Sequence, residues 1–348
     1  MNQKNSHLNV NSLNIASILL AIIAIGWLLI IGRDLLIPLI LALIIWYLLD
    51  TITQLIESFS IGRFKIHHAI SRGGAFMVFI VVILLVTNMV AKNAIELSAN
   101  AGEYQQNINE KLQSLLATVA PNADFDLKTL NDLFNLQKLV SWTTSLIGSV
   151  TSNLLLIMIY LLFLFAEQSV FEQKFTALFG GSETAQIIRN EVIQKIRIYL
   201  SVKTFVSVLT GVLSFILLTL IGVDYAVFWG FIIFLLNYIP TIGSLLGVVF
   251  PAILSLVQFD TSWQFAAVVT FLGGLQFAIG NILEPRLMGS SLNLSGLVIM
   301  LALAVWGSIW GITGMILSVP ITVVILIVCA QFPKSRPIAV LLSREGDV

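Results

Sequence analysis

Charged side chains are scarce in this chain: aspartate, glutamate, lysine and arginine together make up only 10% of its 348 residues. Water-soluble globular proteins usually carry about 25% of them. The apolar share of 58% and the mean hydropathy of +0.98 are typical of a chain that lies in a lipid bilayer. The 18 basic residues match the 18 acidic ones, so the basic surplus of nucleic-acid-binding proteins is missing. We therefore expect the lipid bilayer as a partner and no nucleic acid.

The sequence also lacks the motifs of common enzymes and metal sites. Its single cysteine, Cys329, excludes an intrachain disulfide and every site with several cysteine ligands. Neither a Gly-x-x-x-x-Gly-Lys-Ser/Thr phosphate loop nor a His-Glu-x-x-His metal motif occurs. The apolar regions hold no charged base that could activate a serine nucleophile. We expect no enzyme activity, no cofactor, no metal and no nucleotide-driven engine in this chain.

Long apolar runs are what the sequence has in abundance. A helix rises about 1.5 Å per residue, so about 20 apolar residues cross the hydrocarbon core of a bilayer. Eight regions are of that order, although the second has only 15 residues: 13–32, 35–49, 74–91, 142–166, 204–223, 226–258, 262–283 and 296–330. The sequence therefore predicts an all-α integral membrane protein with about eight transmembrane regions.

Two of these regions are too long for one straight crossing. Region 226–258 has 33 residues with Pro240 midway, and region 296–330 has 35 residues. Three glycines interrupt the second of them: Gly307, Gly311 and Gly314. Proline removes a backbone donor and glycine weakens a helix, so we expect both regions to be broken or re-entrant helical hairpins. Lipid cannot satisfy the freed backbone groups, so both breaks are predicted to line a cavity.

The distribution of basic residues orients the chain. Lysines and arginines gather in 50–73, in 167–203 and in the C-terminal tail, and such stretches usually face the cytoplasm. Both termini are then cytoplasmic. The mildly acidic segment 92–141 is then extracytoplasmic. This gives three parts: membrane spans in 1–91 with the cytoplasmic loop 50–73, the outer segment 92–141, and a transport region 142–348 with a cytoplasmic amphipathic segment 167–203.

The outer segment carries an apolar stripe with intervals of three or four residues. Its members are Leu97, Ala101, Tyr104, Ile108, Leu112, Leu115 and Val119. This spacing predicts an amphipathic helix. Two interpretations stay open: the stripe rests on the membrane or on its own subunit, or it packs between the subunits of a homo-oligomer.

Polar but mostly uncharged side chains lie within the predicted spans. Unpaired polar groups in hydrocarbon cost free energy, so such residues usually bond to one another or line a wet cavity. We predict a substrate-binding or translocation site that consists of Asn237, Tyr238, Pro240, Thr241, Gly243, Gln276 and Asn281.

The charged residues at the end of region 262–283 form a second group. Asn281 and Glu284 are three positions apart and should share a helix face. Glu284 and Arg286 either form an interfacial ion pair that fixes the end of this span, or take part in gating or ion coupling. Both interpretations stay open.

Three stretches of sequence resemble a known family. They are LLNYIPTIGSLLG at 235–247, NILEPRLMG at 281–289 and LALAVWGSIWGITGMILSVPIT at 301–322. With the number of spans and the long outer segment, they resemble the autoinducer-2 exporter family of bacterial transporters, also called PerM-like permeases. The family often has an aromatic residue and a second proline where this chain has Thr241 and Ser244.

The resemblance implies a secondary transporter that forms a homo-oligomer. Members are associated with export of autoinducer-2 or with sodium or lithium efflux in exchange for protons. Autoinducer-2 is small, neutral and rich in hydroxyls, which suits amide and hydroxyl side chains. An antiporter needs a carboxylate deep in the membrane, whereas Glu284 lies near a predicted boundary. We therefore favour a small polar organic solute such as autoinducer-2; sodium (lithium)/proton antiport and a membrane scaffold without transport are the alternatives.

Overall fold

The computed structural model describes residues 17, 20, 21, 23–58, 68–119, 136–178, 183–289 and 293–347. Across these residues the chain is helical, apart from short connections and one isolated bridge between Leu294 and Ser343. Five helical stretches are long and apolar enough to cross a membrane: Arg33–Gln54, Ile70–Asn100, Asn190–Ile221, Trp263–Met288 and Gly296–Gln331. Three shorter apolar helices accompany them: Asn153–Gln168, Ala226–Leu236 and Ile242–Gln258. The predicted all-α, multi-span class is confirmed, whereas the count of eight regions is not.

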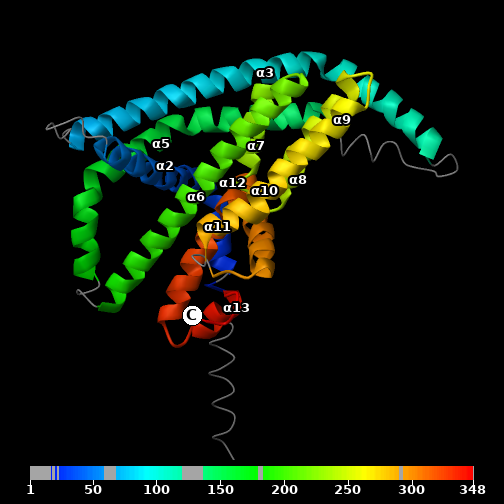
Figure 1. Cartoon of the computed structure of the whole chain (residues 1–348). Helices are drawn as coiled ribbons and strands as arrows, with labels where there is room; N and C mark the ends of the chain where they lie inside the picture. Colours follow the sequence, from blue (N-terminus) through cyan, green and yellow to red (C-terminus); the bar gives the residue numbers. More distant parts are fainter. Residues whose placement is uncertain are drawn as a thin grey trace, which may run out of the picture.

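Three long helices from the N-terminal half pack against one another (Figure 1). They are α2 (Arg33–Ser58), α3 (His68–Val119) and α5 (Leu136–Leu178). Their shared core contains Ala42, Leu49, Ala75, Ile157 and Leu161. The loop expected at 50–73 is partly helical, because α2 and α3 extend into it from both sides. Its basic residues Arg63 and Lys65 lie outside the described residues.

Helix α3 has 52 residues and joins the third predicted span to the outer stripe without a break. Leu97 is fully buried in a core that also contains residues of α7 (Ala226–Leu236) and α8 (Ile242–Gln258). The Tyr104 hydroxyl donates to the Asp224 carboxylate at 2.8 Å. At these two positions the stripe rests on its own subunit. The side chains of Leu112, Leu115 and Val119 lie outside the described residues.

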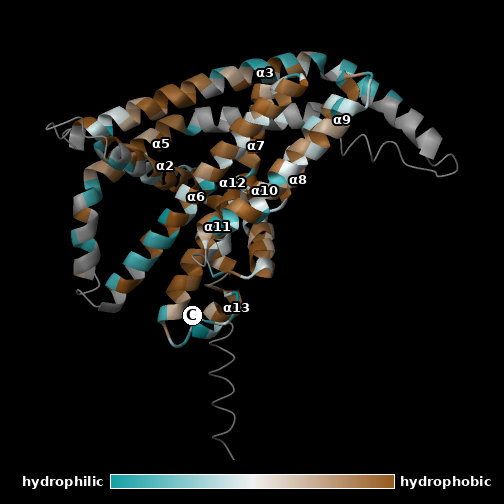
Figure 2. Ribbon diagram, viewed as in Figure 1, coloured by the Kyte–Doolittle hydropathy of each residue, from teal (hydrophilic) through white to brown (hydrophobic). Residues whose placement is uncertain are grey.

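Helix α6 (Glu183–Ile221) contacts most of the other helices of the C-terminal half. It packs against α7 and against α12 (Gly296–Gln331). It also packs against the helical segment Trp263–Met288, mainly at the C-terminal part of that segment, α11 (Glu284–Met288). Its buried face contains four apolar side chains and as many polar ones, the latter being Lys203, Ser207, Thr210 and Ser214. Figure 2 shows that apolar residues dominate α12, whereas the N-terminal part of α6 alternates between hydrophilic and apolar residues.

Region 226–258 forms a first hairpin of two helices, α7 (Ala226–Leu236) and α8 (Ile242–Gln258). The break between them contains Pro240, and Thr241 has the left-handed φ of 58°. The outer ends of the two helices meet, since the Gln258 side chain bonds to the backbone of Asp224 and Gly222 at 2.8 Å each. The chain therefore reverses at the predicted break.

Region 296–330 forms a second hairpin within α12 (Gly296–Gln331). Gly311 interrupts the helix with φ 61° and ψ −139°. A side chain on Gly314 would collide with the Trp306 carbonyl oxygen, whereas eight residues of a straight helix would separate them by about 12 Å. Both ends of α12 adjoin α13 (Arg336–Leu342), which confirms the break expected among these glycines.

The two tips point toward each other. In Figure 1 the open ends of the first hairpin lie toward α3, and those of the second lie toward α13. The Thr241 hydroxyl at the first tip lies 3.6 Å from the Met300 sulfur in the second hairpin. Met300 precedes the break at Gly311 by 11 residues, so the first tip lies beside the first arm of the second hairpin.

The segment 263–288, expected as one plain span, contains two π-helical turns. Its successive parts are α9 (Trp263–Ala267), η1 (Val268–Leu272), α10 (Gly273–Ala278), η2 (Ile279–Leu283) and α11 (Glu284–Met288). A π turn adds a residue to the helical repeat and rotates the side chains that follow, and such turns are frequent at functional sites.

Candidate functional site

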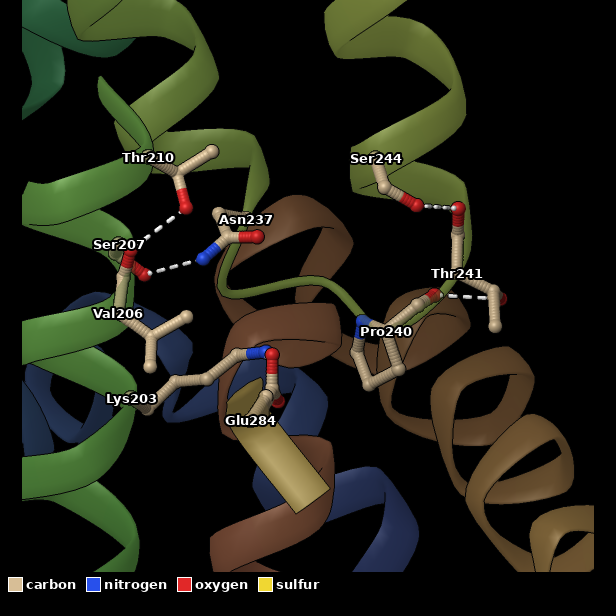
Figure 3. A network of polar contacts seen from close by, with 9 residues as sticks. All are labelled: Lys203, Val206, Ser207, Thr210, Asn237, Pro240, Thr241, Ser244 and Glu284. Atoms are coloured by element: carbon tan, nitrogen blue, oxygen red, sulfur yellow. Dashed lines mark hydrogen bonds and ion pairs between the residues drawn. The ribbon is translucent and has the colours of Figure 1, made fainter. Parts of the chain in front are cut away.

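The tip of the first hairpin is attached to α6 by side-chain hydrogen bonds. The Asn237 amide nitrogen donates to the Ser207 hydroxyl at 3.0 Å, and both residues are buried (Figure 3). The Tyr238 hydroxyl donates to the Thr204 hydroxyl at 2.9 Å. Two of the predicted site residues therefore face one turn of α6.

The same turn of α6 carries a buried ion pair with α11. The Lys203 ammonium lies 2.5 Å from a Glu284 carboxylate oxygen, with side chains 5% and 18% exposed (Figure 3). Arg286, the other charged residue of the predicted pair, is exposed. Glu284 is thus neutralised by a residue 81 positions away and not by its neighbour.

Gln276 is the third predicted site residue that is buried. It lies in α10 between the two π turns, and its amide nitrogen has no hydrogen-bond partner among the described residues. A side chain on Gly247 would approach this nitrogen to 3.0 Å, so Gln276 packs directly against the first hairpin. A buried amide donor without a partner costs about 1–3 kcal/mol, which makes this nitrogen available to a solute.

We call these side chains together with the buried face of α6 the polar seam; its members are Lys203, Thr204, Ser207, Thr210, Ser214, Asn237, Tyr238, Gln276 and Glu284. The residues from α6 were not predicted. Their signal is present in the sequence, because polar residues recur at 203, 207, 210 and 214, which is the three- and four-residue spacing of one helix face.

Other predicted site residues lie apart from the seam. Thr241 is exposed, and its hydroxyl bonds to the Pro240 carbonyl at 2.7 Å, while Ser244 bonds to the Thr241 carbonyl (Figure 3). Gly243 is buried, and any side chain on it would collide with the Leu236 carbonyl. Pro240, Thr241 and Gly243 therefore shape the turn and present no buried polar group.

Asn281 does not share a face with Glu284, contrary to expectation. Its exposed amide nitrogen donates to the carbonyl of Phe277 at 3.2 Å, whereas Glu284 points inward to Lys203. The rule that residues three apart share a face holds for an α-helix, whereas Asn281 lies within the π turn η2 (Ile279–Leu283).

Polar contacts also join the seam's two ends to the N-terminal helices. At the outer end, Asn100 and Tyr104 of α3 bond to Tyr225 and Asp224. Burial, and then the hydrogen bond to Asp224, raise the pKa of Tyr104 above its ordinary value. At the other end, Arg197 of α6 bonds to the hydroxyl of Tyr47 and lies 3.6 Å from Asp50, both on α2.

No group of three or more His, Cys, Asp or Glu in the described ranges could hold a metal ion. The site contains neutral hydrogen-bond donors and acceptors and one ion pair. These groups lie between the first hairpin and the segment 263–288 with its π turns. Discontinuous helices that surround a polar site at membrane depth are typical of secondary transporters. The fold and the site therefore define a multi-pass membrane carrier.

Comparison with known proteins agrees. The family model described as "AI-2E family transporter" matches residues 17–334. The AI-2 transport protein TqsA of Escherichia coli is 30% identical over 316 residues, which cover 90% of each chain. A putative transport protein of Haemophilus influenzae is 28% identical over 357 residues, which cover 99% of each chain. The chain belongs to the AI-2E family of transporters, as the sequence motifs predicted.

Proposed function

We propose that the protein is a secondary permease that carries a small, neutral, hydroxyl-rich organic solute, such as autoinducer-2, along the polar seam. The observation that supports this most directly is the attachment of Asn237 and Tyr238 to Ser207 and Thr204 at 3.0 and 2.9 Å. Amide and hydroxyl groups both donate and accept hydrogen bonds, so they can exchange partners with the hydroxyls of a solute. The relative TqsA is named for transport of AI-2.

The state of Glu284 favours a neutral solute over a cation. In a sodium (lithium)/proton antiporter this carboxylate would have to bind the metal ion or the proton. Here the ammonium of Lys203 already lies 2.5 Å from it, so the seam carries no net charge from this pair. A neutral seam suits a solute that brings hydrogen-bonding groups and no charge.

Gln276 supplies the argument for selectivity. Its unpartnered buried amide nitrogen gains a hydrogen bond only when an acceptor enters the seam. Sites that leave a buried polar group unpaired reject analogues that lack the matching group much more strongly than apolar pockets reject a missing methylene. A deoxy analogue of the solute should therefore bind more weakly than the solute itself.

The proposal includes the membrane arrangement. The two hairpins enter from opposite sides and leave on the side they entered, in a bacterial inner membrane with both termini cytoplasmic. This is supported by the neighbouring outer ends of each hairpin and by the contact of Thr241 with Met300. We also propose a homo-oligomer, for which the outward apolar face of α3, with Met77, Val81 and Leu85, offers area.

A flux assay in liposomes tests the function. Purified protein should move autoinducer-2 or another polyhydroxylated solute, and Asn237→Ala should lower flux about tenfold, equivalent to roughly 1.4 kcal/mol of lost binding. Asn281→Ala is the matched control, because Asn281 bonds its own helix at the surface. Sodium-dependent proton movement that disappears in Glu284→Gln would instead establish antiport. A protein that moves neither solute nor ions would be a scaffold.

A further inference from the structure

The ion pair in the seam allows an inference about selectivity that goes beyond the charge of the solute. An ammonium group is a compact monovalent cation on a flexible stem. In this chain it occupies the position beside Glu284 that a free monovalent cation would take. We propose that Lys203 is a built-in counter-cation that excludes sodium and lithium from the seam, and that without it Glu284 would bind one of these ions. This inference rests on the proposed transport function of the seam.

The surroundings of Glu284 are chemically suited to a small monovalent cation. The Tyr199 hydroxyl is buried without a hydrogen-bond partner and is close enough to Glu284 to interact with it electrostatically. Thr204, the residue after Lys203, carries a further hydroxyl, which accepts a hydrogen bond from the Tyr238 hydroxyl at 2.9 Å. Hard cations prefer oxygen ligands, and one carboxylate with neutral hydroxyls balances a single positive charge.

Among the described residues, the nearest other cations on α6 and α11 are engaged elsewhere or exposed. Helix α12, which packs on α6, has no charged residue in Gly296–Gln331. Arg197, one and a half turns before Lys203, is engaged by Tyr47 and Asp50 of α2. Arg286 follows Glu284 but is exposed. Loss of Lys203 would thus leave Glu284 as an unpaired buried charge, which must gain a cation or a proton.

The experiment measures thermal stability of the purified full-length protein in sodium, lithium or choline chloride at constant ionic strength. The wild type should have the same Tm in all three salts. Lys203→Met should have a lower Tm in choline and should regain stability as sodium or lithium rises, because a ligand that binds only the folded state shifts Tm with its concentration. The double variant Lys203→Met/Glu284→Gln, a neutral pair, should show no response to either ion.

The result that overturns the proposal is a Lys203→Met protein with the same Tm in sodium, lithium and choline, since Glu284 would then bind neither ion. A wild type that is itself stabilised by sodium would overturn it as well. If Lys203→Met folds too poorly in choline, its yield in membranes from cells grown with and without sodium decides the question, and sodium should raise it. Solute flux is measured separately, so a wild type that moves no solute defeats the transport function and leaves the ion response intact.

Discussion

The two hairpins differ in what holds their tips. The tip of the first is tied to α6 through Asn237 and Tyr238. The tip of the second is held by Trp310, whose indole nitrogen donates to the Leu29 carbonyl at 2.9 Å. The neighbouring ring of Trp306 lies 5.5 Å from that of Trp310. One tip therefore meets side-chain hydroxyls in the interior, and the other meets backbone and aromatic surface near the N-terminus.

The breaks are also made by different chemistry. In the first hairpin, proline removes a backbone donor and Thr241 takes a positive φ of 58°, which costs a non-glycine residue about 1–3 kcal/mol. In the second, Gly311 takes the positive φ without this cost. The second break shows that the chain can reverse at a glycine without polar side chains. The polar residues at the first tip therefore serve another purpose, which we assign to binding of the solute.

Glycine substitutions should have the largest effect, and they should affect both hairpins alike. Gly243→Ala and Gly314→Ala each place a methyl group against a backbone carbonyl, of Leu236 and of Trp306. We expect each to cost about 1–3 kcal/mol or to prevent folding, because backbone must move to relieve the overlap. Tm of the purified variants and their yield in membranes measure this.

Gly274→Ala is the matched control, because nothing lies within 4 Å of the added methyl group. It should leave Tm unchanged or raise it slightly. If Gly314→Ala behaved like this control while Gly243→Ala did not, the tight reversal of the second hairpin would be disproved.

The next effect should come from Tyr104, which secures the outer end of the first hairpin alone. Tyr104→Phe removes the hydrogen bond to Asp224 and should cost about 1.5 kcal/mol. The pKa of Tyr104 is raised in the folded state, so the wild type should lose this contribution as pH rises above about 10, where the unfolded tyrosine ionises. Unfolding measured from pH 7 to 11 should show an alkaline loss that is smaller in Tyr104→Phe; equal losses would refute the contact.

The smallest effect should come from the second tip. Trp310→Phe keeps the aromatic packing but removes the donor to Leu29, at an expected cost of about 1 kcal/mol in stability. Solute flux at equal protein amounts should not change, since Trp310 lies outside the polar seam. A flux loss as large as that of Asn237→Ala would show that both tips bind the solute and that the polar seam is not confined to the first tip.

The sequence predicted the breaks in both hairpins because proline and clustered glycines act on the backbone locally. The partner of Glu284 could not be predicted in this way. Lys203 is 81 positions away, and only the packing of α6 on α11 brings the two together. The π turns cannot be recognised from the pattern of apolar residues, so the prediction that Asn281 shares a helix face with Glu284 was wrong. Local conformation was thus readable, while the pairing of distant side chains depended on tertiary packing.

Helix α3 has a mechanical consequence. Its 52 residues make a rod of about 78 Å, more than twice the roughly 30 Å of hydrocarbon that it must cross. The overhang outside the lipid begins where Asn100 and Tyr104 grip the turn that leads into α7. A force applied to the part of α3 beyond Tyr104 would therefore be transmitted through these two hydrogen bonds to the first hairpin.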